Sequence, residues 1–296
     1  MKRALAIDIG GRSTKLALAA ADGSLEQITS LPTPAADADE FLRRTFDSAA
    51  ALAQGNDIAG VGISVAGFVR DDTSAMFYNP NIPWLQGYPL RRAFEDRFGV
   101  PVALDADSNA ACVAEYRLGV GRGAKRFLSL VIGTGVGGGM IVGGEVVRLA
   151  HGGLGDIGHV IVEPFGMPCD SGCYGCAEAT VSAPGIEARA RRRFDEDLDV
   201  RQLIERARRG DQKAIELFAE TGRLLAVAIA SQAVILFPDV VAIAGGVAEA
   251  GDLLIGPARE AFQQLVGPFY RQDVTIAKAE LGWQASLVGA ALPLFH

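Results

Sequence analysis

The feature that most limits the fold of this chain is a strand, glycine turn and second strand that occur twice in the same order. An apolar run from Arg3 to Asp8 meets a pair of glycines, and a strand-like run follows from Lys15 to Ala20. The same order begins again at Phe127, and aligning Gly10 with Gly133 places the copies 123 residues apart. Because glycine pairs after apolar runs mark tight turns, we interpret the pattern as an internal duplication. It predicts two related domains with a cleft between them.

The segments between and after the copies alternate between helical and strand periodicity. Residues 41–52 carry apolar side chains at helical spacing, whereas residues 61–65 alternate as in a strand. In the second copy we expect a glycine loop over 133–139 and a strand only over 140–142. A further strand is predicted over 240–244. Since helices and strands mix in both halves, the sequence predicts a duplicated α/β architecture.

Size and charge exclude several classes of protein. A chain of 296 residues with 49% hydrophobic residues exceeds one typical core and can bury two. Its 35 acidic and 28 basic residues give a net charge of −7, which disfavours nucleic acid as a partner. The start lacks the apolar core of a signal peptide, and the longest nearly apolar stretch, 224–237, is too short to span a bilayer. We expect a cytoplasmic protein without a membrane partner.

The first glycine turn combines an acid, hydroxyls and a lysine. Backbone N–H groups in such a turn can bind phosphate, and a carboxylate at a strand end can hold hydrated magnesium. An ordinary hairpin with a polar turn is the alternative. The second turn could close on phosphate from the other side, and a glycine pair after a third strand suits a flat purine ring. The candidate nucleotide-binding residues are Asp8, Gly10, Gly11, Arg12, Ser13, Thr14, Lys15, Gly133, Thr134, Gly135, Gly245 and Gly246.

A carboxylate, Asp107, stands between a predicted strand and a predicted helix. Near a helix N-terminus it can be held ionised and can accept a proton from a substrate hydroxyl. The alternative reading is a helix cap.

One histidine and three clustered cysteines have the composition of a metal site. His159 precedes Cys169, Cys173 and Cys176, and these four side chains supply the ligand number of a closed structural zinc site. A set of buried thiols is the alternative. Cys112 stands apart and is expected in the core.

These motifs together resemble the ROK family of sugar kinases (repressor, open reading frame, kinase) within the actin-like ATPase superfamily. The resemblance runs essentially from end to end. It rests on Asp8-Ile-Gly-Gly, Asp107-Ser-Asn, Gly133-Thr-Gly-Val-Gly-Gly-Gly, Gly158-His159, Gly175-Cys-Ala-Glu178, Leu281-Gly282 and Gly289-Ala-Ala. It implies a duplicated actin-like, ribonuclease H-like ATPase fold. It also implies a smaller domain of residues 1–118 plus a C-terminal helix at about 284–296, and a larger domain of residues 119–283 with the zinc-binding segment.

The resemblance implies that ATP, with magnesium, phosphorylates a hexose hydroxyl, glucose to glucose 6-phosphate being the leading expectation, in a homodimer. Asp107 matches the family's catalytic base, and structural zinc is implied at the cysteine cluster. His159 matches both a sugar contact and, through its other ring nitrogen, a zinc ligand. The residues that match sugar contacts are Gly67, Asn81, Asp107, Asp156, His159 and Glu178.

Four departures from the family pattern bear on the substrate. Arg12 replaces a Thr or Ser of the first phosphate loop, which leaves the phosphate donor open. Ala106 replaces the Asn before the catalytic Asp, and Asp156 replaces a Glu. In the cysteine motif Ser171 takes the place of the second cysteine, and Cys173 comes two residues late. Another sugar, an amino sugar or a cyclitol is therefore an alternative substrate.

Two rival functions need no catalysis. One is a transcriptional regulator of the family, which would carry an N-terminal helix-turn-helix; this chain begins directly with the first phosphate-binding strand. The other is a sugar-sensing protein that keeps the fold without kinase activity, a possibility raised by Arg12 and Ala106.

Overall fold

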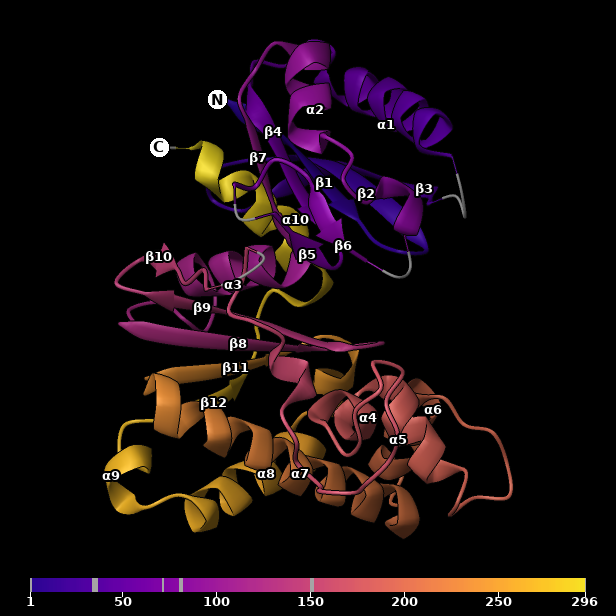
Figure 1. The fold of residues 1–296 in the computed structure, drawn as a ribbon, viewed down its shortest axis with the longest axis vertical. Helices are drawn as coiled ribbons and strands as arrows, with labels where there is room; N and C mark the ends of the chain where they lie inside the picture. The colour runs from indigo at the N-terminus through magenta and orange to yellow at the C-terminus, as the bar shows by residue number, and fades with distance from the viewer. Residues whose placement is uncertain (1, 34–36, 71, 80–81, 150–151, 296) are drawn as a thin grey trace.

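Two five-stranded sheets with the same strand order organise the molecule (Figure 1). The computed structural model describes residues 2–33, 37–70, 72–79, 82–149 and 152–295. The first sheet has the order β3-β2-β1-β4-β7, with bounds Leu25–Pro32, Ser13–Ala19, Arg3–Ile9, Ile58–Val65 and Val102–Ala106. The second has the order β10-β9-β8-β11-β12, with bounds Glu145–Val146, Val136–Val142, Arg126–Ile132, Val240–Ala244 and Thr275–Lys278. A small hairpin joins β5, Phe68–Val69, and β6, Met76–Tyr78.

The duplication predicted from the sequence is confirmed strand by strand. Strands β1 and β8 begin and end 123 residues apart, and so do β2 and β9. In each sheet the two strands of the repeated motif, β1 with β2 and β8 with β9, pair antiparallel. Two later strands extend each sheet in parallel, β4 and β7 beyond β1, and β11 and β12 beyond β8. The duplicated α/β architecture is therefore correct.

The expected strand starts are wrong in both copies. Strand β2 begins at Ser13 rather than Lys15, and β9 begins at Val136 rather than at residue 140. Glycines hide the start of β9 because they give no side-chain periodicity. They stand there for packing: a Cβ at Gly139 would lie 2.9 Å from Cys112 Cβ, and one at Gly138 would overlap the side chain of Ile157.

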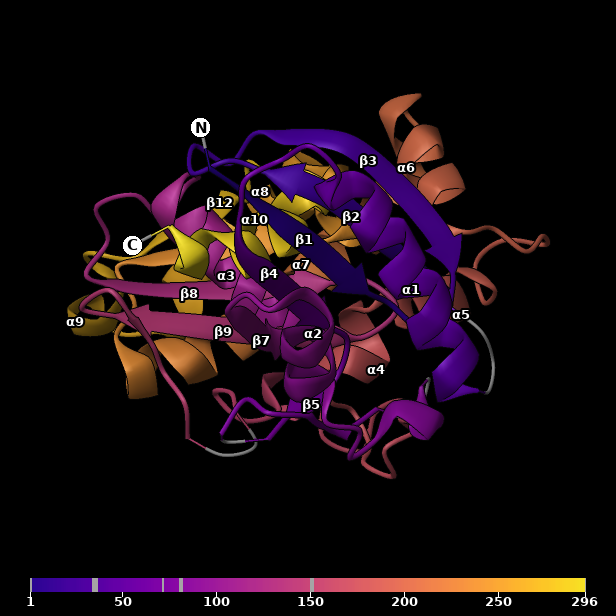
Figure 2. The ribbon, with the colours of Figure 1, turned by 90° about the horizontal axis from the view of Figure 1, so that it is seen from above.

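Helices cover both faces of each sheet. On the first sheet α1, Ala38–Ala53, and α2, Leu90–Phe98, lie together over one face (Figure 2). The second sheet is covered on its far side by α7, Gln212–Leu236, and α8, Asp252–Leu265 (Figure 1). The remaining helices are α3 (Asp107–Arg117), α4 (Ala177–Val181), α5 (Ala183–Ala190), α6 (Val200–Arg208), α9 (Pro268–Arg271) and α10 (Ala285–Ala291).

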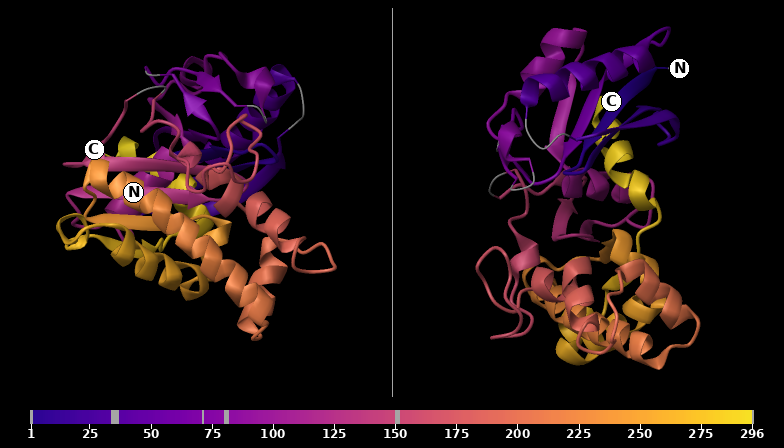
Figure 3. Two further views of the ribbon diagram at one scale, coloured as in Figure 1. Left: turned by 60° about the horizontal axis from the view of Figure 1, so that its bottom comes forward. Right: turned by 90° about the vertical axis from the view of Figure 1, so that its right-hand side faces the viewer.

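Helix α7 is the one helix of the described residues that is long and apolar enough to cross a membrane by length and composition. Its apolar face belongs to the core of the larger domain. Leu217, Phe218 and Leu225 are buried there, and α7 packs along α8 over much of its length (Figure 3, left).

Two helices connect the sheets. Helix α3 packs mainly on β8 and β9, whereas α10 packs on β1 and β4 (Figure 3, right). The two helices also contact each other so closely that a Cβ at Gly289 would overlap the carbonyl of Ala110. The division of the chain at residue 118 stays a prediction, because α3 precedes that point and yet lies against the second sheet.

Candidate active site

The carboxyl ends of three strands of the first sheet meet at one edge. Asp8 on β1 is in register with Ser64 on β4, and Ser64 is in register with Asp105 on β7. The residues that follow these strands therefore lie side by side, and they include Gly10, Gly67 and Asp107. Ser64 Oγ is buried and donates a hydrogen bond of 2.8 Å to Asp8 Oδ1. Asn81, the remaining predicted contact of this domain, lies outside the described residues.

The first glycine turn is held from below by two threonines. The Gly10 N–H donates to the Ser13 carbonyl at 3.1 Å, which closes the turn. Thr33 Oγ1 donates to the Gly10 carbonyl at 2.7 Å and lies 2.9 Å from the hydroxyl of buried Thr14. Thr14 thus supports the turn from within, while Arg12 is exposed at its tip.

Lys15 lies beside the predicted magnesium ligand. Its Nζ is 3.7 Å from Asp8 Oδ2 and 5.7 Å from the ring centre of Trp283. Trp283 belongs to the short 3-10 helix Gly282–Gln284 that leads into α10. The acid, the lysine and this connection form one contact group.

The second glycine turn contacts a carboxylate from α4, Glu178. The Gly133 N–H donates to the Gly135 carbonyl at 2.9 Å, and Thr134 is exposed at the tip. Glu178 Oε2 accepts the Val136 N–H at 2.9 Å, and a Cβ at Gly135 would lie 2.6 Å from that oxygen. Glu178 therefore fixes the turn, which is a contact that sequence reasoning did not assign to it.

The glycine pair after β11 lies beside this turn. Gly245 has φ +87°, and a Cβ there would overlap the Ile132 carbonyl at the end of β8. A Cβ at Gly246 would have no atom within 4 Å, so the backbone is open there. The third glycine signal and the second turn thus form one surface.

Asp107 stands between the two domains at the first turn of α3, and the N-cap is Ala106, without a side-chain cap bond. Its neighbour Ser108 packs near Gly137 of β9, where a Cβ would lie 3.4 Å from Ser108 Cβ. Burial, and after it the negative charge of Asp8, raise the pKa of Asp107 to about 7. The Ser108 N–H, 2.7 Å from Asp107 Oδ1, acts in the opposite direction. A carboxylate with this pKa can take up a proton near neutral pH.

His159 joins the predicted sugar site to the predicted metal site. Its Nε2 lies 3.4 Å from Asp156 Oδ2 and 4.0 Å from Glu178 Oε1. Burial raises the pKa of Asp156, the charge of Glu178 raises it further, and His159 lowers it. Two carboxylates and one imidazole edge are therefore brought together, as the sugar-contact expectation requires.

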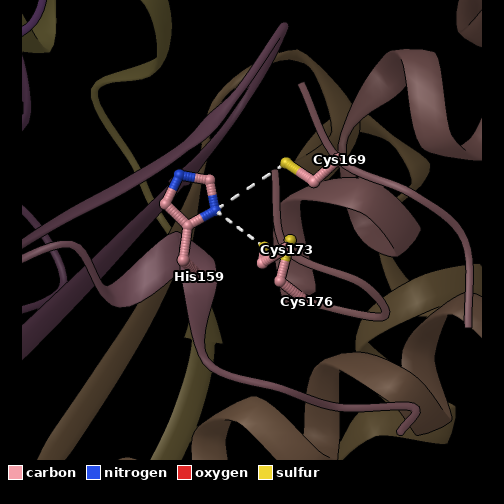
Figure 4. Close-up of side chains that lie close together, drawn as sticks. All are labelled: His159, Cys169, Cys173 and Cys176. Carbon is pink, nitrogen blue, oxygen red and sulfur yellow. Dashed lines mark hydrogen bonds between the residues drawn. The ribbon is translucent and has the colours of Figure 1, made fainter. Parts of the chain in front are cut away.

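The other ring nitrogen faces the cysteines (Figure 4). His159 Nδ1 is 3.8 Å from both Cys169 Sγ and Cys173 Sγ. Together with Cys176, these residues offer four ligand atoms that all lie within 4.8 Å of one another. Tetrahedral zinc with bonds of about 2.3 Å to sulfur and about 2.0 Å to nitrogen separates such atoms by roughly 3.6 Å. The donor set and its spacing fit zinc despite the displaced Cys173.

Ser171 and Cys176 complete this segment in different ways. Ser171 Oγ lies 3.3 Å from both Cys169 Sγ and Cys173 Sγ, and its hydrogen bond contributes most to the lowered pKa of Cys173. Cys176 Sγ accepts the Ala179 N–H at 3.4 Å and so caps α4, the helix that carries Glu178. Burial raises the pKa of Cys176 to about 12. Cys112 is buried, as expected.

Sequence reasoning missed one polar group behind the site. Asp105 accepts a hydrogen bond of 2.8 Å from Asn109 and forms an ion pair with Arg148, at the end of the β10 segment. Asn109 and Arg148 both donate to the Gly152 carbonyl, at 2.9 and 2.5 Å. The only sequence signal for this link between the domains was one acidic residue, Asp105, in the otherwise apolar strand β7.

A surface hollow of about 280 Å³ lies elsewhere, on the outer face of the first domain between α1 and α2. Its lining includes Phe46, Tyr88 and Arg97 but none of the predicted site residues. We assign no role to it, because none of the polar groups described above lines it.

A duplicated sheet with two glycine turns and an acid between them defines the actin-like ATPase class. The sequence profile of the ROK family matches residues 4–295, and the chain belongs to this family. It is 30% identical to a glucokinase of Streptomyces coelicolor, over 97% of this chain and 96% of that protein. It is 33% identical to an N-acetylmannosamine kinase of Escherichia coli O139:H28, over 97% of each. The structure of a ROK family glucokinase from Streptomyces griseus with glucose and AMPPNP superposes with a TM-score of 0.85, 30% identity and 98% coverage of both chains.

The raised pKa of Asp107 predicts a pH-dependent stability. Between about pH 4 and pH 7 the folded chain holds a proton on Asp107 that the unfolded chain releases, so this contribution is full below about pH 4 and lost as the pH rises through 7. Asp107→Asn removes the ionisation, so its free energy of unfolding relative to wild type should rise by about 1–4 kcal/mol from pH 4.5 to pH 8. Urea unfolding of both proteins at several pH values measures it. A difference that does not change with pH would contradict the burial of Asp107.

Proposed function

We propose that the chain is an ATP-dependent sugar kinase that transfers a phosphoryl group to a hexose hydroxyl, with glucose to glucose 6-phosphate as the leading reaction. The observation that carries the proposal is the position of Asp107 at the first turn of α3, beside Asp8 and between the two glycine turns. The glucokinase relatives, with 30% identity along nearly the whole chain, support it.

Asp107 acts as the general base in this reaction. It takes the proton from the acceptor hydroxyl as that oxygen attacks the terminal phosphorus of ATP, and the bond from that phosphorus to the bridging oxygen breaks, so that ADP leaves. Backbone N–H groups of both turns bind the phosphates, apart from those of Gly10 and Gly133, which close the turns. Asp8, whose side chain is 13% exposed and accepts the Ser64 hydroxyl, would hold hydrated magnesium. Magnesium supplies charge neutralisation when bound. Lys15 and Arg12 add positive charge beside the first turn.

The adenine lies on the open backbone at Gly245-Gly246, beside the second turn. The remaining predicted nucleotide contacts, Gly10, Gly11 and Ser13 with Gly133, Thr134 and Gly135, use the exposed faces of the two turns. Thr14 contributes through its support of the first turn, because its hydroxyl pairs with Thr33.

The sugar is held by polar groups from both domains. The carboxylates of Asp156 and Glu178 each have an oxygen within 4.0 Å of the imidazole nitrogen of His159, and such groups bind a polyol in fixed geometry. Gly67, which has φ +96° and packs against Asn79, and Asn81 are assigned to the same site on the first domain.

Zinc, held by His159, Cys169, Cys173 and Cys176, has a structural role in this proposal. It would fix the ring of His159 and the N-terminus of α4, which are the supports of two sugar contacts. We further propose a cytoplasmic homodimer that acts on small sugars without a nucleic-acid or membrane partner, in keeping with the net charge of −7.

Two observations favour a second candidate substrate class. Ala106 is buried, and its methyl group cannot form a hydrogen bond with a sugar hydroxyl. The side chain of Asp156 is one methylene shorter than that of glutamate. An amino sugar, a cyclitol or another hexose could occupy the space these residues leave, and an N-acetylmannosamine kinase is among the relatives. ATP consumption measured over a panel of sugars would exclude a sugar-binding protein without kinase activity.

Removal of the base tests the reaction. Asp107→Asn keeps the shape of the helix start but cannot accept the proton, so turnover should fall by about 10²-fold or more. Sugar binding, measured by calorimetry, should change little, and exposed Asp195→Asn is the charge-matched control. Wild-type kcat/KM should rise about tenfold per pH unit below about 7 and then level off, because Asp107 must be ionised. Wild-type turnover in Asp107→Asn would end the assignment.

Metal removal tests the zinc site. Protein purified without added metal should contain one zinc per chain by elemental analysis, and a chelator should lower the unfolding temperature and the affinity for sugar together. Cys176→Ser should reproduce both effects, because it removes a thiolate ligand although a serine hydroxyl can still cap α4. Cys112→Ser, at a buried cysteine outside the cluster, is the control and should keep its zinc. A metal content well below one per chain in wild type would refute the site.

Restoring an amide tests specificity. An unpaired substrate hydroxyl costs about 1–3 kcal/mol, so Ala106→Asn should raise kcat/KM for glucose about tenfold relative to other sugars. Ala106→Ser is the control: serine caps a helix as well as asparagine does, but its side chain is shorter. A gain seen with Asn and not with Ser therefore comes from the sugar contact and not from the helix cap. A panel of hexoses, amino sugars and cyclitols gives the comparison. Strong preference of the wild type for glucose, with no gain from Asn, would show that these two positions do not select the substrate.

A further inference from the structure

One buried carboxylate takes no part in the site described above. Glu115, near the C-terminal end of α3, is fully buried. Its Oε1 accepts the Leu281 N–H at 2.7 Å, and its Oε2 accepts the Glu280 N–H at 3.1 Å and the Val120 N–H at 3.3 Å. Among the ion pairs of the described residues none involves Glu115, so backbone N–H groups alone satisfy it. A carboxylate that far from solvent is tolerated only with such bonds.

The three donors belong to two different connections between elements. Val120 lies in the segment 118–125, which runs from α3 to β8. Glu280 and Leu281 lie in the segment 279–284, which runs from the last strand of the second sheet to α10 on the first sheet. One side chain therefore ties the chain crossing between the domains to the helix that begins with Asp107.

The packing of α3 against α10 leaves a need for such a tie. At their closest approach the two helices present small residues, Ala110 on α3 and Gly289 on α10. Because neither side chain there extends beyond a methyl group, this crossing by itself fixes the axial register weakly. Besides the bonds of Glu115, one further hydrogen bond links the two helices: Arg117 Nη1, at the end of α3, donates to the Leu292 carbonyl, just after α10, at 3.3 Å.

We propose that Glu115 is a positioning residue for the kinase reaction. It fixes α3 along its axis against the crossing into α10, and it thereby holds Asp107, about two turns away on the same helix, in line with the acceptor hydroxyl. This inference rests on the proposed kinase function. A displacement of about 1 Å at a reacting group can cost about 10²-fold in rate, so a small slip of α3 is enough to matter.

Two substitutions disturb the tie from different sides. Glu115→Gln replaces one accepting oxygen by an NH₂ group that cannot accept a backbone N–H. Gly119→Ala keeps the glutamate at position 115, but the added methyl group would overlap Glu115 Oε2 and displace the carboxylate. Leu203→Ala, in the core of α6 in the larger domain, is the control for a general loss of stability.

The expected result is a split between kcat and KM. Glu115→Gln and Gly119→Ala should each lower kcat for sugar phosphorylation about 10- to 100-fold, with KM for ATP within about twofold of wild type. The double variant should be no worse than either single one. Leu203→Ala should lower the unfolding temperature without this loss of kcat.

A double-mutant cycle with Asp107 decides whether Glu115 acts through the base. In the Asp107→Asn background, Glu115→Gln should lower the residual kcat by less than about threefold, because the group it positions is gone. An equal loss in both backgrounds, or a wild-type kcat in Glu115→Gln, would overturn the proposal.

Amide hydrogen exchange separates this inference from the proposed function. Residues 279–284 should exchange faster in Glu115→Gln than in wild type, whether or not the protein phosphorylates sugars. A wild-type protein without activity on any sugar would refute the kinase and, with it, the positioning role. Unchanged exchange at 279–284 in an active enzyme would refute the tie alone.

Discussion

The contact between the backbones of α3 and α10 is the constraint on which the rest of the structure depends. It exists because Gly289 has no side chain to separate the two helices at Ala110. Helix α3 lies on the second sheet and α10 on the first, so this contact joins the two halves of the duplication. It also sets the place of Asp107, which begins α3 where the edges of the two sheets approach each other. The catalytic proposal therefore depends on a packing feature some distance from the reacting groups.

The acids between and behind the glycine turns are stabilised in four different ways. Asp8 accepts a hydroxyl and lies near Lys15, and Asp105 pairs with Arg148. Glu115 is satisfied by backbone N–H groups alone. Asp107 accepts the Ser108 N–H, but burial and the charge of Asp8 raise its pKa to about 7. The three supported acids serve structure or charge, and the least supported one is the group suited to exchange a proton.

The proposed zinc ligands and the proposed sugar contacts share a side chain, His159, rather than merely lying close together. One edge of His159 faces the thiols and the other faces Asp156 and Glu178. Cys176 caps the helix on which Glu178 stands, and Glu178 in turn holds the second glycine turn through Val136. A change of metal occupancy would therefore act on sugar contacts and on the phosphate turn through bonds that are already formed.

The duplication, the two glycine turns, Asp107 as the candidate base and the four candidate zinc ligands could all be predicted from the sequence, because apolar runs, glycines and cysteines make each visible in local spacing. The start of β9 could not be predicted, since Gly137–Gly139 have no side chains to show a strand periodicity. Their lack of a Cβ lets α3 and Ile157 pack directly on the strand, which only the structure shows. Nor could the sequence show that Thr14 faces Thr33, that Glu178 binds the second turn or that Glu115 ties residues 280 and 281 to α3. These contacts join residues 19 to 166 positions apart, and only the packing of two sheets around one pair of helices brings them together.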